Sequence, residues 1–151
     1  MGWMESIGTA IQFIEENITE ELSIDEIAEH VNLSSFYFQK GFAMLCGFTI
    51  SEYIRNRRLA LAGNDLATGE DRIIDIAMKY GYDSPDSFTK AFTRFHGISP
   101  SAAKERGVEL LDFAPLRIIL SLEGGTMIDY RIEEKAAFTI MGRKRCFNNE
   151  T

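Results

Sequence analysis

The chain has 151 residues, 45% of them hydrophobic, which suits one folded domain with a core and excludes global disorder. No apolar run approaches the roughly 20 residues that span a bilayer, and no signal sequence is evident, so we expect a cytoplasmic protein without a membrane partner. The net charge of −7 by itself argues against a nucleic-acid partner.

The first third of the chain predicts three helices. Isoleucines recur at helical spacing over residues 4–18, and a capping box at Ser23–Glu26 begins the next helix. The residues after this helix, Asn32-Leu33-Ser34, predict a turn. Ser34 or Ser35 can then cap a third helix, which ends before Gly47.

A longer helix and a second group of short helices follow. A capping box at residues 49–52 opens a helix over residues 53–67, which would connect the two parts. Gly81 suits the left-handed position of a turn. Ser84-Pro85 and Ser99-Pro100 each combine an N-cap with proline at the first helical position, so each predicts a helix start.

After Gly107 the pattern becomes strand-like. Three segments read as strands, namely residues 116–122, 127–133 and 137–143. Three strands cannot close a two-layer domain, so we expect residues 1–107 to form a mainly α domain. Residues 108–151 would then be a linker and the β-containing opening of an α+β domain. Exposed strands could also pair between chains and form a homodimer.

The same unit occurs twice in the helical part. Residues 24–50 can be laid over residues 73–100, and Phe38, Phe42 and Gly47 of the first copy recur 50 residues later as the same residue types. Each copy reads as a helix, a turn, a second helix and a glycine stop, which is the pattern of a helix-turn-helix. Because such a unit can place one helix in a major groove, the repeat predicts two DNA-reading helices.

The positive charge gathers where the repeat predicts DNA contact. Residues 1–33 contain eight acidic residues and no Lys or Arg. Residues 34–62 and 88–106 each contain four Lys or Arg against one acidic residue. Phosphate contact depends on the field within about one Debye length, roughly 8–10 Å, so the acidic total does not exclude DNA.

The second helix of each copy has candidate base-reading residues. In the first copy, Phe38 and Phe42 would face the core, leaving Phe36, Gln39 and Lys40 outside. Glutamine can bond adenine, lysine can bond guanine, and an aromatic ring can contact a thymine methyl group. In the second copy the outward residues are Asp86, Ser87, Lys90 and Arg94. The alternative is a solvated polar face without a reading role, and the repetition favours reading over it.

Three arginines of the connecting helix are candidates for phosphate contact or for structural ion pairs. Arg55, Arg57 and Arg58 follow one another closely. We expect at least one of them to pair with an acid from the first 33 residues, such as Glu16 or Glu20.

Catalysis has no support in the sequence. His30 and His96 have no constellation of carboxylates or cysteines, and His96 precedes a predicted helix end, where a cation is favourable. Cys46 and Cys146 have no disulfide or zinc spacing, and no GxSxG, HExxH, GxGxxG or P-loop motif occurs. We therefore expect no enzyme activity, no metal and no cofactor.

About residues 4–107 resemble the AraC/XylS family of bacterial transcription regulators. IIDIAMKYGYDSPDSFTKAFTRFHGISPSAAK is similar to the family's signature region, and SIDEIAEHVNLSSFYFQKGF matches the preceding unit. The resemblance implies seven helices, two helix-turn-helix units joined by a long helix, and a double-stranded DNA operator. It implies base reading by Phe36, Gln39, Lys40, Asp86, Ser87 and Lys90. It implies phosphate contacts by Ser35 and Arg94, to which we add Ser34 and the arginines Arg55, Arg57 and Arg58.

Two residues depart from the family pattern. Asp86 is unfavourable near phosphate unless it accepts a hydrogen bond from cytosine N4. Gly41, inside the first reading helix, should cost about 0.5–1 kcal/mol relative to alanine.

The tail resembles the start of a GyrI-like effector-binding domain in IDYRIEEKAAFTIMGRKR. This implies a small-molecule effector in the full-length protein. Our interpretation is a sequence-specific, ligand-responsive transcriptional regulator that binds double-stranded DNA, with RNA polymerase as a further candidate partner. In the alternative interpretation, the helix-turn-helix pair is a scaffold for a ligand-binding or protein-interaction module, whose working face is the acidic surface of residues 1–33.

Overall fold

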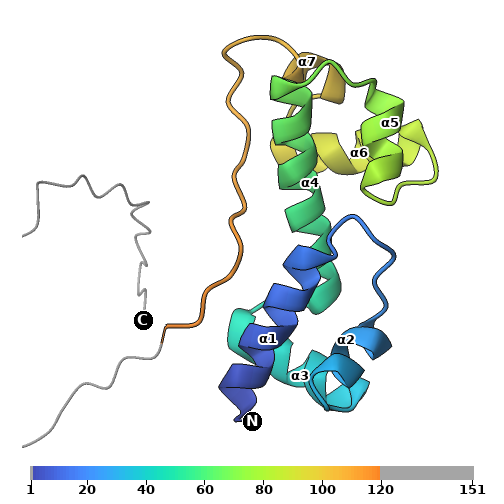
Figure 1. The fold of residues 1–151 in the computed structure, drawn as a ribbon. Helices are drawn as coiled ribbons and strands as arrows, with labels where there is room; N and C mark the ends of the chain where they lie inside the picture. The colour runs from blue at the N-terminus through green and yellow to red at the C-terminus, as the bar shows by residue number, and fades with distance from the viewer. Residues whose placement is uncertain (1, 120–151) are drawn as a thin grey trace, which may run out of the picture. The chain divides into compact units, whose positions relative to one another are not determined.

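The computed structural model describes residues 2–119, and this part of the chain contains seven α-helices (Figure 1). In chain order they are α1 (Trp3–Glu16), α2 (Ile24–His30), α3 (Ser35–Cys46), α4 (Ile50–Thr68), α5 (Ile73–Lys79), α6 (Pro85–His96) and α7 (Pro100–Ala103). The expected seven-helix architecture with two helix-turn-helix units is confirmed. None of the described helices is both long and apolar enough to cross a membrane.

The first module consists of α1, α2, α3 and the first half of α4, packed around one core. Phe38 and Phe42 of α3 are fully buried there beside Tyr53 of α4, as their spacing predicted. The turn before α3 is made by Asn32, whose φ of 56° is a left-handed conformation that asparagine tolerates. The side chain of Ser34 then accepts a hydrogen bond from the backbone N–H of Tyr37 and caps α3.

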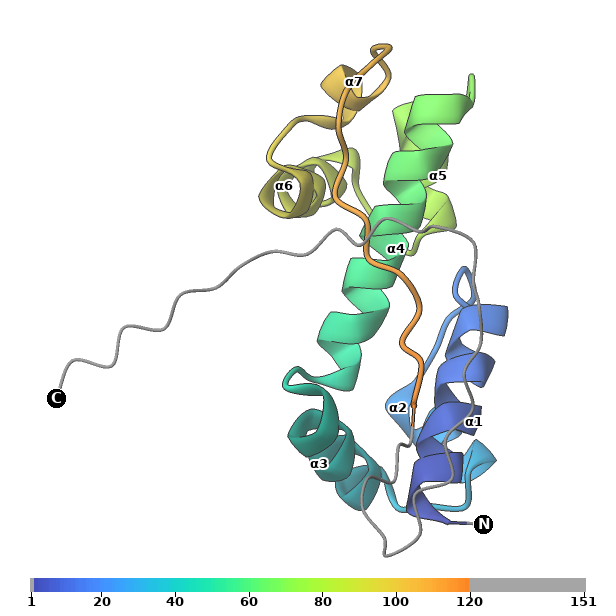
Figure 2. The same cartoon turned by 90° about the vertical axis from the view of Figure 1, so that its left-hand side faces the viewer.

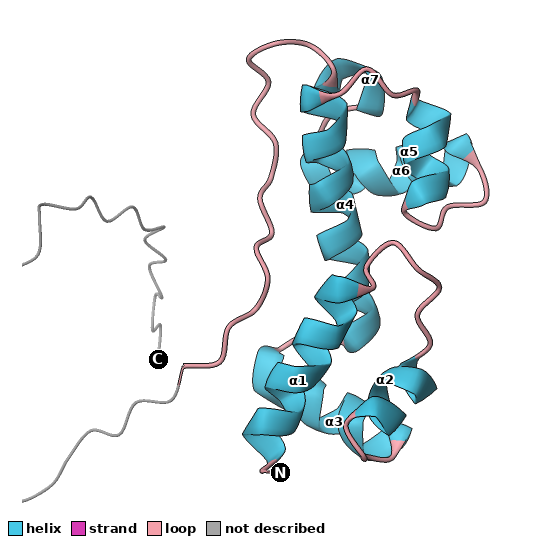
Figure 3. Ribbon diagram, viewed as in Figure 1, coloured by secondary structure: helices cyan, strands magenta, loops and turns pink. Residues whose placement is uncertain are grey.

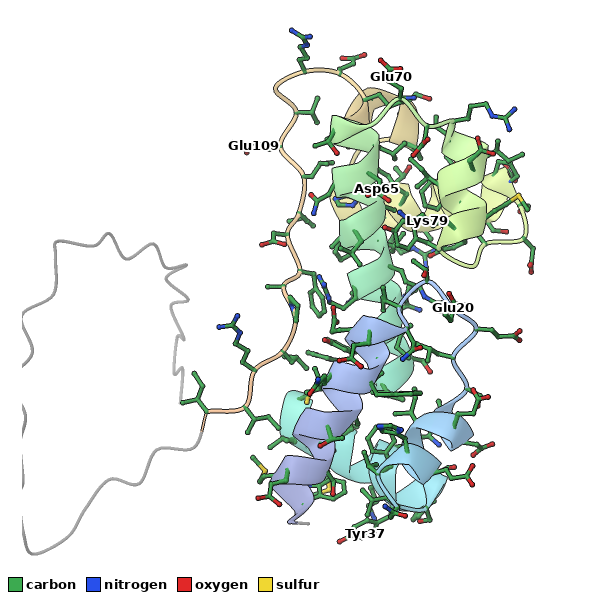
Figure 4. The ribbon with its side chains drawn as sticks, viewed as in Figure 1. Glu20, Tyr37, Asp65, Glu70, Lys79 and Glu109 are labelled. Carbon is green, nitrogen blue, oxygen red and sulfur yellow. The ribbon has the colours of Figure 1, made fainter. Side chains whose placement is uncertain are left out.

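The second module consists of the rest of α4 with α5, α6 and α7 around a separate core. Gly81 has φ of 82° in its turn, as predicted, and Ser84 caps α6. The helices α4 and α5 are tied by Asp65, whose carboxylate accepts hydrogen bonds of 2.8 Å from both Lys79 and Tyr80. Figure 4 shows Asp65 and Lys79 pointing toward one another from these two helices.

After α7 the chain turns back along α4 as an extended segment, residues 108–119, which we call the strap (Figure 2). Leu110 of the strap packs against the second core, whereas Phe113, Leu116 and Ile118 pack against the first. The compact unit formed with the helices extends to Ile119. The strap therefore contacts both modules.

The strand expected at residues 116–122 is not formed over residues 116–119, and no strand occurs anywhere in residues 2–119 (Figure 3). A strand needs a hydrogen-bonded neighbouring strand, but the strap lies against helices. The backbone N–H of Leu116 donates instead to the Tyr53 hydroxyl, at 3.4 Å. The strands expected at 127–133 and 137–143 lie outside the described residues.

Candidate nucleic-acid interface

The outer face of α3 presents the three residues that the sequence proposed for base reading. Phe36 is 74% exposed, and Gln39 and Lys40 are exposed as well. The ammonium group of Lys40 lies 5.9 Å from the centre of the Phe36 ring, a cation–π contact that keeps the two side chains together. Phe38 and Phe42 occupy the opposite face, which explains why this set points outward.

The start of α3 is built from two serines with different roles. Ser34 is the N-cap, so its hydroxyl oxygen is occupied by the Tyr37 amide. The Ser35 hydroxyl donates to the carboxylate of Asp25 at the start of α2. The hydroxyl groups of both serines, which were predicted to contact phosphate, therefore form hydrogen bonds within the protein.

The outer face of α6 is more polar than that of α3. Asp86, Ser87, Lys90 and Arg94 are all exposed. The Asp86 carboxylate lies 3.4 Å from the Lys90 ammonium group, one helical turn away, so it offsets part of the positive charge there. The Ser87 hydroxyl lies 2.8 Å from that of Ser84, the N-cap of the helix.

The three connecting arginines have three different environments. Arg55 is exposed and remains a candidate for phosphate contact. Arg57 is only 6% exposed, and its guanidinium group donates to both carboxylate oxygens of Glu15, at 2.8 and 2.7 Å, and to the backbone carbonyl of Phe113. A phosphate cannot reach a guanidinium that is buried and whose three nitrogens all donate within the protein. Arg57 is therefore structural, and the phosphate contact expected for it is withdrawn.

Arg58 is also turned inward. Its guanidinium group donates to the backbone carbonyls of Ile18 and Glu20, at 2.8 and 2.7 Å, in the loop between α1 and α2. Figure 4 shows Glu20 in this loop. The expected pairing of one of these arginines with an acid of the first 33 residues is confirmed by Arg57, although its partner is Glu15 and not Glu16 or Glu20. Arg58 uses backbone oxygens instead.

Hydrogen bonds outweigh burial in setting the pKa of Glu15. Burial alone would raise the pKa of the Glu15 carboxyl, but hydrogen bonds from Arg57 and Tyr53 outweigh it, and the pKa is lowered. The Tyr53 hydroxyl donates to Glu15 at 2.7 Å, and its burial together with this bond raises the pKa of Tyr53. Glu15 thus stays ionised and Tyr53 stays protonated at neutral pH.

A hollow of about 480 Å³ lies between α4 and α6. It brings together Arg55, Ser87, Lys90 and Arg94, which the sequence had proposed separately. Asn56 and Tyr82 also line the hollow, and the sequence did not identify either of them. Tyr82 could have been found as the aromatic residue directly after the turn glycine, whereas Asn56 carries no such signal.

An apolar surface flanks the outer face of α3. The exposed side chains of Tyr37 and Met44 lie beside Trp3 of α1, whose ring meets that of Tyr37 edge-on with centroids 5.4 Å apart. A Cβ atom on Gly41 would lie 2.0 Å from the Trp3 ring. Glycine inside α3 is therefore required for the close approach of Trp3.

The two histidines serve packing. His30 stacks on Phe13 with ring centroids 4.2 Å apart. His96 was expected to act as a cation at a helix end, but this expectation is wrong because the side chain is buried. Its Nδ1 accepts from the backbone N–H of Leu111 at 3.1 Å, which leaves the proton on Nε2 to donate to the Leu59 carbonyl at 2.9 Å. Burial lowers the pKa of His96 and keeps it neutral.

No group of three or more potential metal ligands is present among the described residues. The candidate interface consists of hydrogen-bond donors and cations on the outer faces of α3 and α6, with the exposed Phe36 ring on α3. These groups suit contact with base edges and phosphates.

Comparison with known proteins identifies the fold as that of a regulator family. A family model for the helix-turn-helix domain matches residues 27–106. The transcriptional activator AarP of Providencia stuartii is 42% identical over 95 residues, which are 63% of this chain and 70% of AarP. The regulatory protein SoxS of Salmonella typhimurium is 40% identical over 106 residues, which are 70% of this chain and 99% of SoxS.

A solved structure gives the same result. An AraC-type transcriptional regulator from Chromobacterium violaceum superposes with a TM-score of 0.63 at 27% identity, covering 66% of this chain and 89% of that one. The chain belongs to the AraC-type helix-turn-helix family of DNA-binding transcriptional regulators.

Proposed function

We propose that α3 and α6 read base edges in two major-groove segments of one duplex and that the protein thereby selects a particular operator sequence. The observation that carries this proposal is the matching arrangement of the two helices. Each holds a pair of phenylalanines in a core and turns polar side chains outward from one compact unit. Two readers on one unit allow a single chain to recognise two neighbouring sites.

The two helices offer different chemistry to DNA. On α3, Gln39 can bond adenine, Lys40 can bond guanine and the exposed Phe36 ring can contact a thymine methyl group. On α6, Ser87 and Lys90 supply donors, while Asp86 can accept from cytosine N4 or remain paired with Lys90. We therefore expect the first site to carry most of the sequence preference.

Selection of bound duplexes from a random pool, followed by anisotropy titrations, tests this proposal. Gln39→Ala should reduce discrimination at one base pair by about 1–3 kcal/mol and leave the other positions unchanged. The control is Gln12→Ala, which removes an exposed glutamine from α1 and should not change the preference. If Gln39→Ala weakens binding equally on all sequences, Gln39 contacts the backbone and its base-reading role is wrong.

A second candidate function is favoured by the apolar surface of Trp3, Tyr37 and Met44. Exposed apolar patches often mark protein contacts, so the helix-turn-helix pair could also be a scaffold for a protein partner. A salt titration separates the two functions. Operator binding predicts that log K falls with log[salt] by about 0.9 for each phosphate contacted. A flat response would favour the scaffold.

Regulation through the tail rests on sequence resemblance alone. A small-molecule effector bound by a domain that begins in residues 108–151 would make the DNA-binding part ligand-responsive. A contact of the acidic residues 1–33 with RNA polymerase and a homodimer formed through residues 116–143 are further proposals. Sedimentation of the full chain with and without operator DNA tests the homodimer, because pairing through this region predicts two chains for each site.

A further inference from the structure

We propose that Arg58 is a clamp between the two modules, which fixes the distance and the angle between α3 and α6 and thereby selects the spacing of the two sites on DNA. The proposal rests on the DNA-reading function of both helices. It adds to that function a determinant of specificity that contacts neither a base nor a phosphate. In this role Arg58 is a positioning residue.

Arg58 contacts parts of both modules from the middle of α4. Its Nε and Nη2 atoms donate to the backbone carbonyls of Ile18 and Glu20, at 2.8 and 2.7 Å, in the loop between α1 and α2. Figures 1 and 2 both show this loop rising along α4 toward α5. The Nη1 atom lies 3.0 Å from the place that a Cβ atom would take on Gly81, in the turn between α5 and α6. One guanidinium group therefore lies between a loop of the first module and a turn of the second.

Two hollows flank Arg58 at this junction. Their volumes are about 240 and 610 Å³, and both are lined by Arg58, by Leu22 of the loop, and by Gly81 and Tyr82 of the turn. The loop and the turn are therefore not closely packed against each other on either side of Arg58. Within residues 2–119, none of the ion pairs joins one module to the other. The guanidinium group is thus the contact that can hold the loop and the turn in register.

The chemistry of the contact requires arginine. The two hydrogen bonds to the loop come from two nitrogen atoms of one planar, rigid group, whose third nitrogen lies against the turn. A lysine ammonium is a single point charge on a flexible stem and cannot hold this arrangement. Because both acceptors are backbone carbonyls, the contact fixes the path of the loop itself. The clamp therefore restrains bending and twisting of the modules about α4.

The spacing of two sites on DNA reports directly on such a restraint. One additional base pair moves the second site by about 3.4 Å along the helix axis and rotates it by about 34°. A rigid pair of α3 and α6 can follow only if the DNA is deformed. We therefore expect the wild-type protein to bind best at one spacing, and about tenfold more weakly one base pair away. Loosely joined modules would accept several spacings.

The first test uses the full chain and duplexes that carry its two selected sites at a series of spacings. Arg58→Leu should reduce the tenfold preference to less than about threefold, because the modules can then adjust to each duplex. The preference is a ratio for one protein on two duplexes, so a partly unfolded variant does not distort it. Arg106→Leu removes an exposed arginine and is the control, which should keep the preference of the wild-type protein.

Arg58→Lys separates the clamp from the phosphate contact that the sequence predicts for Arg58. The clamp requires Arg58→Lys to lose the spacing preference as Arg58→Leu does, although the positive charge is kept. A phosphate contact requires Arg58→Lys to keep the preference, while Arg58→Leu weakens binding equally at all spacings. The second pattern overturns the clamp.

A second test measures the modules without DNA. Spin labels on Glu29→Cys in α2 and Ile74→Cys in α5, two exposed positions, report the distance between the modules after Cys46→Ser and Cys146→Ser remove the native thiols. Arg58→Leu should broaden the distribution of distances. An unchanged width overturns the clamp, as does a wild-type protein that binds all spacings equally. If the wild-type protein binds no operator, the proposed function fails, and the width of the distribution still decides whether Arg58 is a clamp.

Discussion

Glu15 anchors α1 to α4 through its ion pair with Arg57, whose side chain is almost inaccessible to solvent. The Glu15 side chain is 21% exposed and that of Arg57 is 7% exposed, so removing one partner leaves the other charge poorly compensated. We expect Glu15→Gln to lower the free energy of unfolding by about 3 kcal/mol, the low end for a buried pair because Glu15 keeps some exposure. Urea denaturation at pH 7 measures this loss.

The pH dependence of this pair provides its control. Because the pKa of Glu15 is lowered from 4.5 in the folded protein, its stabilisation is complete above pH 4.5 and is lost as pH falls through the folded pKa. The gap between the wild-type protein and Glu15→Gln should therefore close in acid. Glu16→Gln, at the exposed neighbouring position, should change stability by less than about 0.5 kcal/mol. Equal effects of the two variants would contradict the role of Glu15.

His96 makes stability depend on pH near neutrality. The folded pKa lies below 6.5, so the unfolded chain takes up the proton first. The contribution of neutral His96 to the free energy of unfolding is therefore fully present above pH 6.5 and is lost as pH falls toward the folded pKa. Protonation would also place an Nδ1 proton against the amide of Leu111, in the strap. Thermal unfolding between pH 7 and pH 5 measures the effect.

One variant separates His96 from the other titrating groups. His96→Gln keeps one donor and one acceptor without titrating, so its stability should change less with pH than that of the wild-type protein. Identical pH profiles for the wild-type protein and His96→Gln would refute the assignment.

The turn between α5 and α6 requires glycine for two reasons. Gly81 has φ of 82°, and a Cβ atom there would lie 3.0 Å from Nη1 of Arg58. We expect Gly81→Ala to lower the free energy of unfolding by about 1–2 kcal/mol. Gly8→Ala is the matched control, because Gly8 lies inside α1 with open space around its Cβ position and should be neutral or stabilising by up to about 1 kcal/mol. Denaturant midpoints that move together would contradict the conformational argument.

Helix starts and outward faces could be predicted because their determinants are local. The side chains of Ser34 and Ser84 each accept a hydrogen bond from the backbone N–H three residues later and so cap their helices. The spacing of Phe38 and Phe42 is enough to orient α3. The fate of Arg57 could not be predicted, because its burial depends on Glu15, 42 positions away, and on Phe113 in the strap.

The hollow between α4 and α6 was hidden for a similar reason. Its cations come from two helices that meet only in the folded molecule, so the sequence showed them as separate candidates.

The strand predicted over residues 116–119 of the strap was wrong for a related reason. Alternating apolar residues suit a strand, but they also suit an extended segment that packs one side against helices, as Leu116 and Ile118 do.

At the scale of the whole described unit, three connections hold the two modules together. The helix α4 runs through both cores. On one side, Arg58 binds the loop between α1 and α2 and lies against the turn at Gly81. The strap adds a further link, with Leu110 in the second core and Phe113 in the first. The relative position of α3 and α6 therefore depends on more than a single helix.

This arrangement predicts that Phe113 of the strap stabilises the first module more than the second. Phe113 packs on Tyr53 and Phe48, with ring centroids 6.0 Å apart in each case. We expect Phe113→Ala to lower the free energy of unfolding by about 2 kcal/mol, less than for a fully buried phenylalanine because the side chain is half-buried. Hydrogen exchange should then show lost protection in the strap and in α1–α3, with a smaller change in α5 and α6. Leu111→Ala, at a 50% exposed strap position, is the control and should leave both modules protected. A uniform loss across both modules in Phe113→Ala would mean that the modules unfold as one unit, and it would contradict a separate effect of Phe113 on the first module.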